Sequence, residues 1–295
     1  MRILVTGREG QVVRSLVERG PSAGHEILAL GRPELDLVRD PDAIVAAIEA
    51  QRPDVLVSAA AYTAVDKAET EPELAFAINQ RGAGAVARAA RLIGAPLVHL
   101  STDYVFDGTK ESPYTEEDSP CPTGVYGASK LAGEQAVLAE HADSAILRTA
   151  WVYSPFGANF LKTMLRLAAD RQEIGVVADQ RGNPTSALDI ADGILSVAAN
   201  LLGDDGPELR GIFHMTADGD ASWAEFAEWI FTASAGDGGP RARVRHIATA
   251  DYPSAAKRPA NSRLDCARLE RQHGVSLPNW RGSAEAVVAR ILENP

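Results

Sequence analysis

Short apolar runs alternate with helical segments through the first half of the chain, and this alternation constrains the fold most strongly. The apolar runs before residue 153 are Arg2–Thr6, His25–Leu30, Asp54–Ala61, Pro96–Ser101 and Ser144–Val152. Each run is too continuously apolar for a strand with one face in water, so both faces are expected to be buried. Such alternation favours an α/β fold, a Rossmann-like doubly wound parallel sheet with helices on both sides.

The helices expected between these strands cover residues 11–19, 40–52, 71–94 and 125–141, and a loop is expected at 104–124. Asp40 is suited to cap the second of them, with Pro41 at its first position. After about Tyr153 the alternation loosens. The segments expected there are helices at 159–172, 187–202, 222–235 and 283–293 and a strand at 211–215.

This change in pattern predicts a smaller C-terminal, substrate-binding lobe over the carboxyl edge of the sheet, where ligands of such folds bind. Residues 1–153, with about 206–235, are expected to form the NAD(P)-binding domain. Residues of about 154–205 and 236–295 are expected to form the lobe.

The net charge of −11 argues against a nucleic-acid partner, because neutralising phosphates requires a basic surface. Cys121 and Cys266, the two cysteines, form no metal-ligand motif. No apolar run approaches the length of about 18 residues that a membrane helix needs. The N-terminus is expected to be a strand and a turn rather than a signal peptide, which favours a cytoplasmic protein without a membrane partner.

The first strand ends in a glycine turn, Gly7 to Gly10, which opens a helix. Gly7 permits a tight turn, and Gly10 lets backbone amides approach a pyrophosphate at the positive end of the helix. Glycine pairs are weak evidence alone, and an ordinary strand–helix turn is the alternative. The strand–turn–helix setting favours a dinucleotide site, with Val13 in place of the third glycine of the usual motif.

The end of the second strand bears on which dinucleotide is bound. An acidic residue there would hold the ribose 2′-hydroxyl, whereas an arginine accommodates a 2′-phosphate. The chain has Arg32 at this place, which favours NADPH as the cofactor and leaves NADH possible; a surface arginine is the alternative. Asp36 and Leu37 follow and are candidates to line the adenine pocket.

Tyr126 and Lys130 are four residues apart, so they share one face of the expected helix. A lysine ammonium near a phenol lowers the pKa of the phenol and makes it a better proton donor at neutral pH. Thr102, at the end of the fourth strand, is placed to direct its hydroxyl at a substrate oxygen. An ordinary helix face with a solvated lysine is the alternative, but the position after the fourth strand favours a site that protonates a carbonyl oxygen during hydride transfer.

Several sequence blocks resemble the dTDP-4-dehydrorhamnose reductase family, a branch of the extended short-chain dehydrogenase/reductases. The similarity spans nearly the whole chain. The blocks are G-x-x-G-Q near the start, AAAYTAVDKAE (59–69), STDYVFDG (101–108), VYGASKLAGE (125–134), RTAWVY (148–153), NF-x-K-T-M-L-R-L-A (159–168), DQ-x-G-x-PT (179–185) and RPANSRLD (258–265).

The resemblance implies a soluble enzyme that reduces C4 of dTDP-4-dehydro-L-rhamnose with a nicotinamide cofactor and binds this nucleotide sugar as its small-molecule partner. It implies Tyr126 as the proton donor, with Lys130 as its modulator and Thr102 as a tuner and substrate contact. Implied cofactor contacts are Gly10, Gln11, Val12, Asp36, Leu37, Ala61, Tyr62 and Thr63. Asp103 and Trp151 match substrate contacts, with packing in the core as the alternative for Trp151. Arg258 is a candidate to pair with the diphosphate, with a structural salt bridge as its alternative.

Some members of this family hold magnesium at a dimer interface through glutamates. The matching positions here include Ser15 and Leu188, which are poor ligands for a hard cation. We therefore expect no metal site, magnesium being doubtful as a cofactor, and either a monomer or a homodimer.

Two other functions stay open at this point. One is a reductase, epimerase or dehydratase of a different nucleotide sugar. The other is a non-catalytic, NADP-binding regulatory subunit, which the presence of both Tyr126 and Lys130 disfavours.

Overall fold

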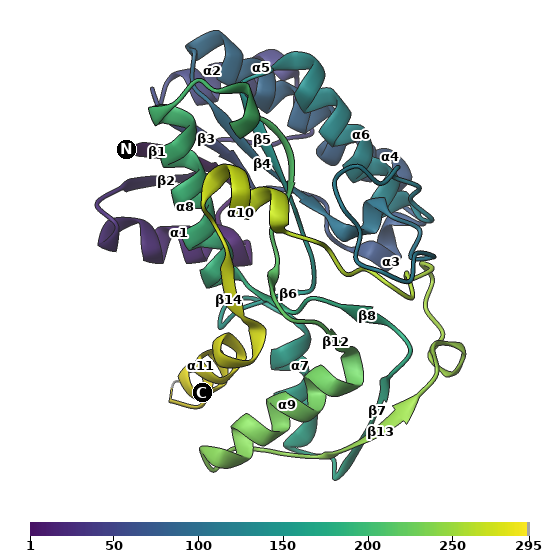
Figure 1. The fold of residues 1–295 in the computed structure, drawn as a ribbon. Helices are drawn as coiled ribbons and strands as arrows, with labels where there is room; N and C mark the ends of the chain where they lie inside the picture. The colour runs from purple at the N-terminus through teal and green to yellow at the C-terminus, as the bar shows by residue number, and fades with distance from the viewer. Residues whose placement is uncertain (294–295) are drawn as a thin grey trace.

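The computed structural model describes residues 1–293, and a six-stranded sheet lies at its centre (Figure 1). The strand order is β10-β5-β4-β3-β1-β2, and all neighbouring strands run parallel. The strands are β1 Arg2–Thr6, β2 Glu26–Leu30, β3 Val55–Ser58, β4 Leu97–Thr102, β5 Ser144–Thr149 and β10 Gly211–His214. The expected doubly wound parallel sheet is confirmed.

Successive strand residues enter two different cores, as the continuous apolar runs require. Ile3 and Val5 of β1 face a core shared with α1 and α8, whereas Leu4 between them faces a core shared with α2 and α5. β3 repeats this alternation, with Val55 and Val57 on the first side. Burial on both faces explains why these strands lack an alternating polar pattern.

The helices on the two faces follow the sequence closely, with one difference. They are α1 Gln11–Ser22 and α8 Ala187–Gly203 on one face, and α2 Pro41–Glu49, α5 Ala83–Ile93 and α6 Val125–Glu140 on the other. The long helix expected at 71–94 is divided into α4 Pro72–Phe76, the π-helical segment η1 Ala77–Gly82, and α5. A short helix, α3 Val65–Ala68, precedes it.

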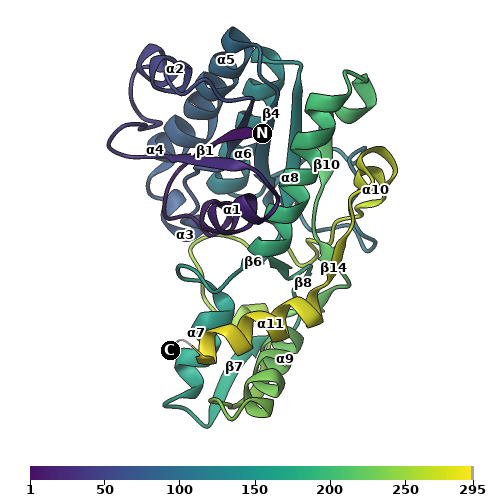
Figure 2. The same cartoon turned by 90° about the vertical axis from the view of Figure 1, so that its left-hand side faces the viewer.

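A third core lies in a lobe below the sheet, where α7 Phe160–Ala168, α9 Trp223–Gly236 and α11 Trp280–Glu293 pack together (Figure 2). The parallel pair β7 Glu173–Val177 and β13 Arg243–Ile247 completes it. Packing therefore divides the chain differently from the expected ranges. α8 belongs with the sheet and α9 with the lobe, because their apolar faces enter those two cores.

The remaining elements are short. They are β6 Val152–Tyr153, β8 Arg181–Gly182, β9 Thr185–Ser186, β11 Ala217–Asp218, β12 Ala221–Ser222, β14 Leu277–Asn279, α10 Ala267–His273, and the 3-10 turns η2 Asp103–Val105, η3 Pro207–Leu209 and η4 Thr249–Asp251. Within residues 1–293, no helix is both long and apolar enough to cross a membrane.

Candidate active site

A cavity of about 1250 Å³ opens at the carboxyl edge of the sheet, between the sheet and the lobe. Its volume exceeds that of a typical single small-molecule site, so it has room for a dinucleotide and a second ligand. The predicted site residues that line it are Gly7, Gly10, Gln11, Val12, Arg32, Asp36, Leu37, Ala61, Thr63, Thr102, Asp103, Tyr126, Lys130, Trp151 and Arg258. The sequence therefore identified a set of residues that the fold brings together.

Tyr62 does not fit that prediction. Its side chain is 9% exposed and turned away from the cavity, with its hydroxyl donating to Glu71 Oε2 at 2.7 Å. Only its neighbours Ala61 and Thr63 line the cavity. The side chain of Tyr62 packs on the adjoining helices, so a cofactor contact by Tyr62 stays a prediction.

The glycine turn has the backbone that an anion site needs. Gly7 has φ +101°, a region that side chains disfavour, and its amide donates to Leu30 O at 2.7 Å. α1 begins at Gln11 with Gly10 as its cap and no side chain bonded to the first amides. Those amides therefore remain available to a phosphate at the positive end of the helix.

Gln11 joins this turn to the entrance of the lobe. Its Oε1 accepts hydrogen bonds from Ser154 Oγ at 2.8 Å and Asn159 Nδ2 at 2.9 Å. Its Nε2 donates to Val152 O at 3.4 Å. The Gln11 side chain thus holds the segment that follows β5 against the start of α1, and Gln11 also lines the cavity.

Two arginines lie near the end of β2, where the adenosine ribose of a dinucleotide is expected. Arg8 pairs with Glu34 at 2.8 Å, a contact that sequence reasoning missed. Arg32 lines the same cavity, and within residues 1–293 its guanidinium has no hydrogen bond or ion pair. Arg32 is therefore the cation there that no carboxylate neutralises.

Thr102, Tyr126 and Lys130 meet where β4 ends and α6 begins. Thr102 Oγ1 donates to Asp103 Oδ1 at 2.9 Å and accepts from the amide of Tyr104 at 3.2 Å. The ring of Tyr126 lies edge-on to that of Tyr104, with 5.6 Å between centroids. Lys130 is 3% exposed, and its Nζ donates to Leu100 O at 2.6 Å.

Burial dominates the acidity of both candidate catalytic groups. It raises the pKa of the Tyr126 phenol well above its usual value, and the Thr102 side chain lowers that pKa in part. Burial lowers the pKa of Lys130 to about 8, and the charge of Glu134 partly opposes this lowering. Lys130 is not among the groups that act on the Tyr126 pKa, so the lowering of that pKa by lysine remains a prediction for the complex with ligands.

Asp103 is a buried carboxyl at the cavity wall. Burial raises its pKa to about 6, and contacts with Ser262 and Thr102 oppose that rise. Its Oδ2 is buried without a hydrogen-bond partner among the described residues. A buried polar atom without a partner is unfavourable, so Oδ2 is suited to accept a hydrogen bond from a ligand hydroxyl or, when protonated, to donate one.

Asn79, in the π-helical segment, links the loop after β3 to α6, and sequence reasoning missed it. Its Oδ1 accepts from the amide of Tyr62 at 2.8 Å, and its Nδ2 donates to Tyr62 O and to Ser129 Oγ. Ser129 Oγ in turn donates to Tyr126 O at 2.8 Å. π-helical turns occur often at functional sites, and this one directs a buried amide between two parts of the site.

Trp151 forms an aromatic wall together with Trp223, another residue that sequence reasoning missed. The two indoles are parallel with 3.5 Å between centroids, and Phe160 lies against Trp223 at 4.6 Å. Trp151 has φ +47°, and its Nε1 donates to Ser262 Oγ at 3.1 Å. A Cβ at Gly182 would lie 2.4 Å from the indole, so glycine is required for this close approach.

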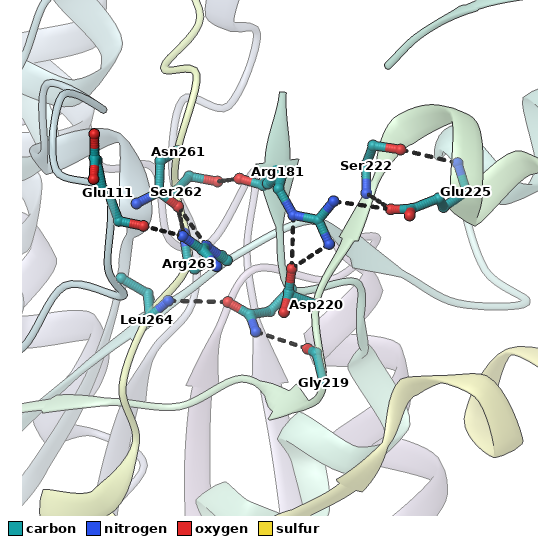
Figure 3. A network of polar contacts seen from close by, with 11 residues as sticks. Glu111, Arg181, Gly219, Asp220, Ser222, Glu225, Asn261, Ser262, Arg263 and Leu264 are labelled. Carbon is teal, nitrogen blue, oxygen red and sulfur yellow. Dashed lines mark hydrogen bonds and ion pairs between the residues drawn. The ribbon is translucent and has the colours of Figure 1, made fainter. Parts of the chain in front are cut away.

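A network of polar contacts links the segments that carry Ser262 and the start of α9 (Figure 3). The amide of Ser262 donates to Arg181 O at 2.8 Å, and the guanidinium of Arg181 pairs with Asp220 at 2.6 Å. Ser222 and Glu225 form reciprocal hydrogen bonds that cap α9 directly before Trp223. Both Ser262 and Trp223 are thereby held in place from outside the cavity.

Arg258 reaches the mouth of the cavity from the C-terminal segment. Its Nη2 donates to Asp66 Oδ2 at 2.9 Å and its Nη1 to the hydroxyl of Tyr104 at 3.2 Å. Asp66 also accepts from the amide of Ala256 at 3.1 Å. The structural salt bridge considered from the sequence is thus present, on a guanidinium that also lines the cavity.

Metal ligands are not gathered anywhere in residues 1–293, where no three His, Cys, Asp or Glu side chains converge. Ser15 is buried on α1, its hydroxyl bonded to Gln11 O, and Leu188 is buried in the core of the lobe.

A dinucleotide turn and a tyrosine–lysine face in one cavity place the chain among the NAD(P)-dependent oxidoreductases, in the short-chain dehydrogenase/reductase class. Comparison with known proteins narrows this class. The family model described as the RmlD substrate binding domain matches residues 1–293, and the chain belongs to this family.

Several of the similar proteins are named dTDP-4-dehydrorhamnose reductase. A dTDP-4-dehydrorhamnose reductase of Sinorhizobium fredii is 50% identical over 293 residues, which are 99% of this chain and 98% of that protein. The crystal structure of the Clostridium acetobutylicum dTDP-4-dehydrorhamnose reductase is 36% identical, with a TM-score of 0.92 over 99% of this chain and 100% of that one. The Bacillus anthracis reductase, solved with NADP, is also 36% identical, with a TM-score of 0.91 over 98% and 99%.

Proposed function

We propose that this chain reduces the C4 ketone of dTDP-4-dehydro-L-rhamnose to give dTDP-L-rhamnose, with NADPH as the preferred hydride donor. The observation that supports this most is that Tyr126, Lys130 and Thr102 share one cavity with the glycine turn. The names of the similar reductases support the choice of substrate.

The residues present fit a nicotinamide dinucleotide. The amides at the start of α1 suit the pyrophosphate, and the neighbouring turn leaves no Cβ at Gly7 or Gly10 to obstruct it. Arg32 suits a 2′-phosphate, and Asp36 and Leu37 line the cavity beyond it. When bound, the nicotinamide supplies the hydride that reduces the ketone carbon.

Tyr126 donates its phenolic proton to the C4 oxygen as negative charge develops there. Thr102 donates a hydrogen bond to the same oxygen and holds it toward the phenol. Lys130 binds the nicotinamide ribose and provides positive charge that lowers the pKa of the phenol. This charge is needed, because burial alone makes the Tyr126 phenol a weaker acid than free tyrosine.

Asp103, Trp151 and Arg258 contact the substrate in this proposal. Asp103 binds a sugar hydroxyl through its unpartnered oxygen. Trp151 offers an apolar indole to the sugar or base. Arg258 binds the diphosphate, for which it exchanges or shares its contact with Asp66.

The test follows the loss of NADPH absorbance with purified protein and enzymatically generated dTDP-4-dehydro-L-rhamnose, with the product identified by chromatography. Parallel reactions contain NADH, or EDTA, or a different 4-keto nucleotide sugar. We expect oxidation that is faster with NADPH, is unchanged by EDTA and forms dTDP-L-rhamnose. Tight NADPH binding without oxidation of this sugar would refute the proposed substrate.

A further inference from the structure

A buried ion pair lies beneath the candidate catalytic residues and joins α6 to the sheet. Arg148 of β5 donates from Nε to Glu134 Oε1 at 2.9 Å and from Nη2 to Glu134 Oε2 at 2.7 Å. Both side chains are 1% exposed. Ser101 of β4 also donates its hydroxyl to Glu134 Oε1.

Stability alone is a weak reason for such a pair. Removing two charges from water is costly, and apolar residues of similar volume often serve a folded protein equally well. Arg148 Nη1 is buried and has no partner among the described residues, so the pair is not even fully satisfied.

Each member adjoins a residue of the site. Ser101 directly precedes Thr102. In the β4–β5 register, Ser101 is paired with Arg148. Glu134 lies one helical turn after Lys130, as Lys130 lies one turn after Tyr126. The cluster thus fixes the catalytic face of α6 to the strand end that carries Thr102.

The cluster also sets the charge around Lys130, whose own hydrogen-bond acceptor is the uncharged Leu100 O. Burial lowers the pKa of Lys130 to about 8, and the Glu134 carboxylate raises it. On β4, His99 is buried with a pKa that burial lowers far below its usual value, so it stays neutral.

The remaining titratable groups near this part of α6 do not replace Glu134. Burial raises the pKa of Asp103 to about 6 and keeps Tyr126 protonated. The Arg148 guanidinium is bound to Glu134 and is not among the groups that shift the pKa of Lys130. Glu134 is the carboxylate on the lysine's own helix face.

We propose that Ser101, Glu134 and Arg148 are positioning residues for the reaction. Arg148 and Ser101 orient the Glu134 carboxylate, which holds Lys130 as an ammonium and keeps Tyr126 facing Thr102. This inference rests on the roles proposed above for Tyr126, Lys130 and Thr102.

The experiment compares pH profiles of kcat and KM for four proteins. They are the wild type, Ser101→Ala, the double variant Glu134→Leu/Arg148→Met, and the control Glu140→Gln. The double variant removes both charges together, which avoids leaving Arg148 buried and unpaired. Glu140 is on the same helix but 43% exposed and paired with Arg91 at the surface.

We expect the double variant to fold and to lose about tenfold or more in kcat, with KM changed less than about threefold. The alkaline limb of its kcat profile should move to lower pH, because Lys130 loses its proton earlier. Ser101→Ala should move the limb in the same direction by less, with about a threefold loss in kcat, and Glu140→Gln should match the wild type.

A double variant with wild-type kcat and pH profile would overturn the proposal and leave the pair a structural role only. If circular dichroism shows that the double variant does not fold, Ser101→Ala decides, and an unmoved limb there overturns the proposal. NADPH affinity as a function of pH, measured by protein fluorescence without sugar, keeps this test separate from the substrate. If the wild type binds NADPH but does not reduce the sugar, the proposed substrate is refuted. The pH dependence of NADPH affinity still reports the charge of Lys130 in that case.

Discussion

The fold removes water from around the side chains of this site, and this desolvation changes their pKa values. Lys130 is almost completely buried and Tyr126 is partly buried, and burial disfavours the charged form of each. Burial therefore pushes the phenol away from useful acidity and the lysine toward neutrality. The chemistry proposed here depends on neighbouring charges that oppose both effects.

Tyr126→Phe removes the proton donor and leaves the shape of the site. We expect it to bind NADPH as the wild type does and to lose turnover by about a hundredfold or more. Lys130→Met should weaken both binding and turnover, because the ammonium is proposed to contact the cofactor as well. Fluorescence titration and steady-state kinetics measure the two quantities, and full turnover in Tyr126→Phe would exclude the phenol from the mechanism.

Asp103 makes stability depend on pH. Its pKa of about 6 in the folded protein exceeds the usual value of 3.8. Between these values the folded protein retains a proton that the unfolded chain loses, so the free energy of unfolding decreases as the pH rises. Asp103→Asn removes this ionisation, and we expect it to gain up to roughly 3 kcal/mol over the wild type near pH 8.

Thermal unfolding of both proteins near pH 4 and pH 8 tests this prediction. Near pH 4 the Asp103 carboxyl is largely protonated in the folded state, so the two melting temperatures should nearly coincide. If Asp103→Asn raised the melting temperature equally at both pH values, burial of the ionised carboxylate would not be the cause of the stabilisation.

Arg32 is expected to determine the preference for NADPH over NADH. Arg32→Gln removes a charge that no carboxylate neutralises, so we expect about a tenfold loss in NADP⁺ affinity and little change for NAD⁺. Isothermal titration calorimetry with both cofactors gives the ratio. Arg39→Gln, an exposed residue outside the large cavity, is the matched control, and equal losses for both cofactors in Arg32→Gln would contradict the assignment.

At the scale of elements, the close approach of α6 to the π-helical segment positions the catalytic face. A Cβ at Gly133 would lie 2.1 Å from Asn79 O, so this contact requires glycine. Gly133→Ala should therefore destabilise the protein by about 2 kcal/mol or more.

The control for this substitution is Gly84→Ala in α5. The nearest atom to the new Cβ there is the Cβ of Ala136, at 3.4 Å. Alanine there should be neutral or slightly stabilising, since it favours the helix. Chemical denaturation of both variants gives the difference, and similar stabilities would show that α6 shifts without cost.

The strands and most helices could be predicted because their apolar periods are local. The continuous apolar runs of β1, β3 and β4 already indicate that both faces of the sheet are buried. The spacing of Tyr126 and Lys130 already places them on one face of a helix. The π-helical segment was missed because its residues have the pattern of an ordinary helix, and it differs from one only in its backbone hydrogen bonds.

The missed site residues share a different cause. Trp223 and Ser262 are distant in sequence from Trp151, and a single sequence contains no signal that the three meet. Arg148 reads as an interruption in an apolar strand, and its meaning appears only when Glu134 is seen opposite it.

For the whole molecule, the relation between sheet and lobe depends on a few long-range contacts around the cavity. Gln11 binds the chain as it leaves β5, and Arg258 binds Asp66 on the opposite side. On another surface, Glu18 of α1 pairs with Arg290 of α11 at 2.6 Å. Gln11 and Arg258 also line the cavity, so we expect a bound ligand to strengthen the junction between sheet and lobe.

The four tryptophans are all in or beside the lobe and form two pairs, Trp151 with Trp223 and Trp229 with Trp280. Parallel indoles 3.5 Å apart couple their electronic transitions, so the first pair gives the protein an intrinsic optical reporter at the ligand site. Intrinsic fluorescence during unfolding should follow the lobe, while far-ultraviolet circular dichroism follows the entire backbone. Coincident curves would mean that the protein unfolds as one unit, and an earlier fluorescence transition would mean that the lobe separates first.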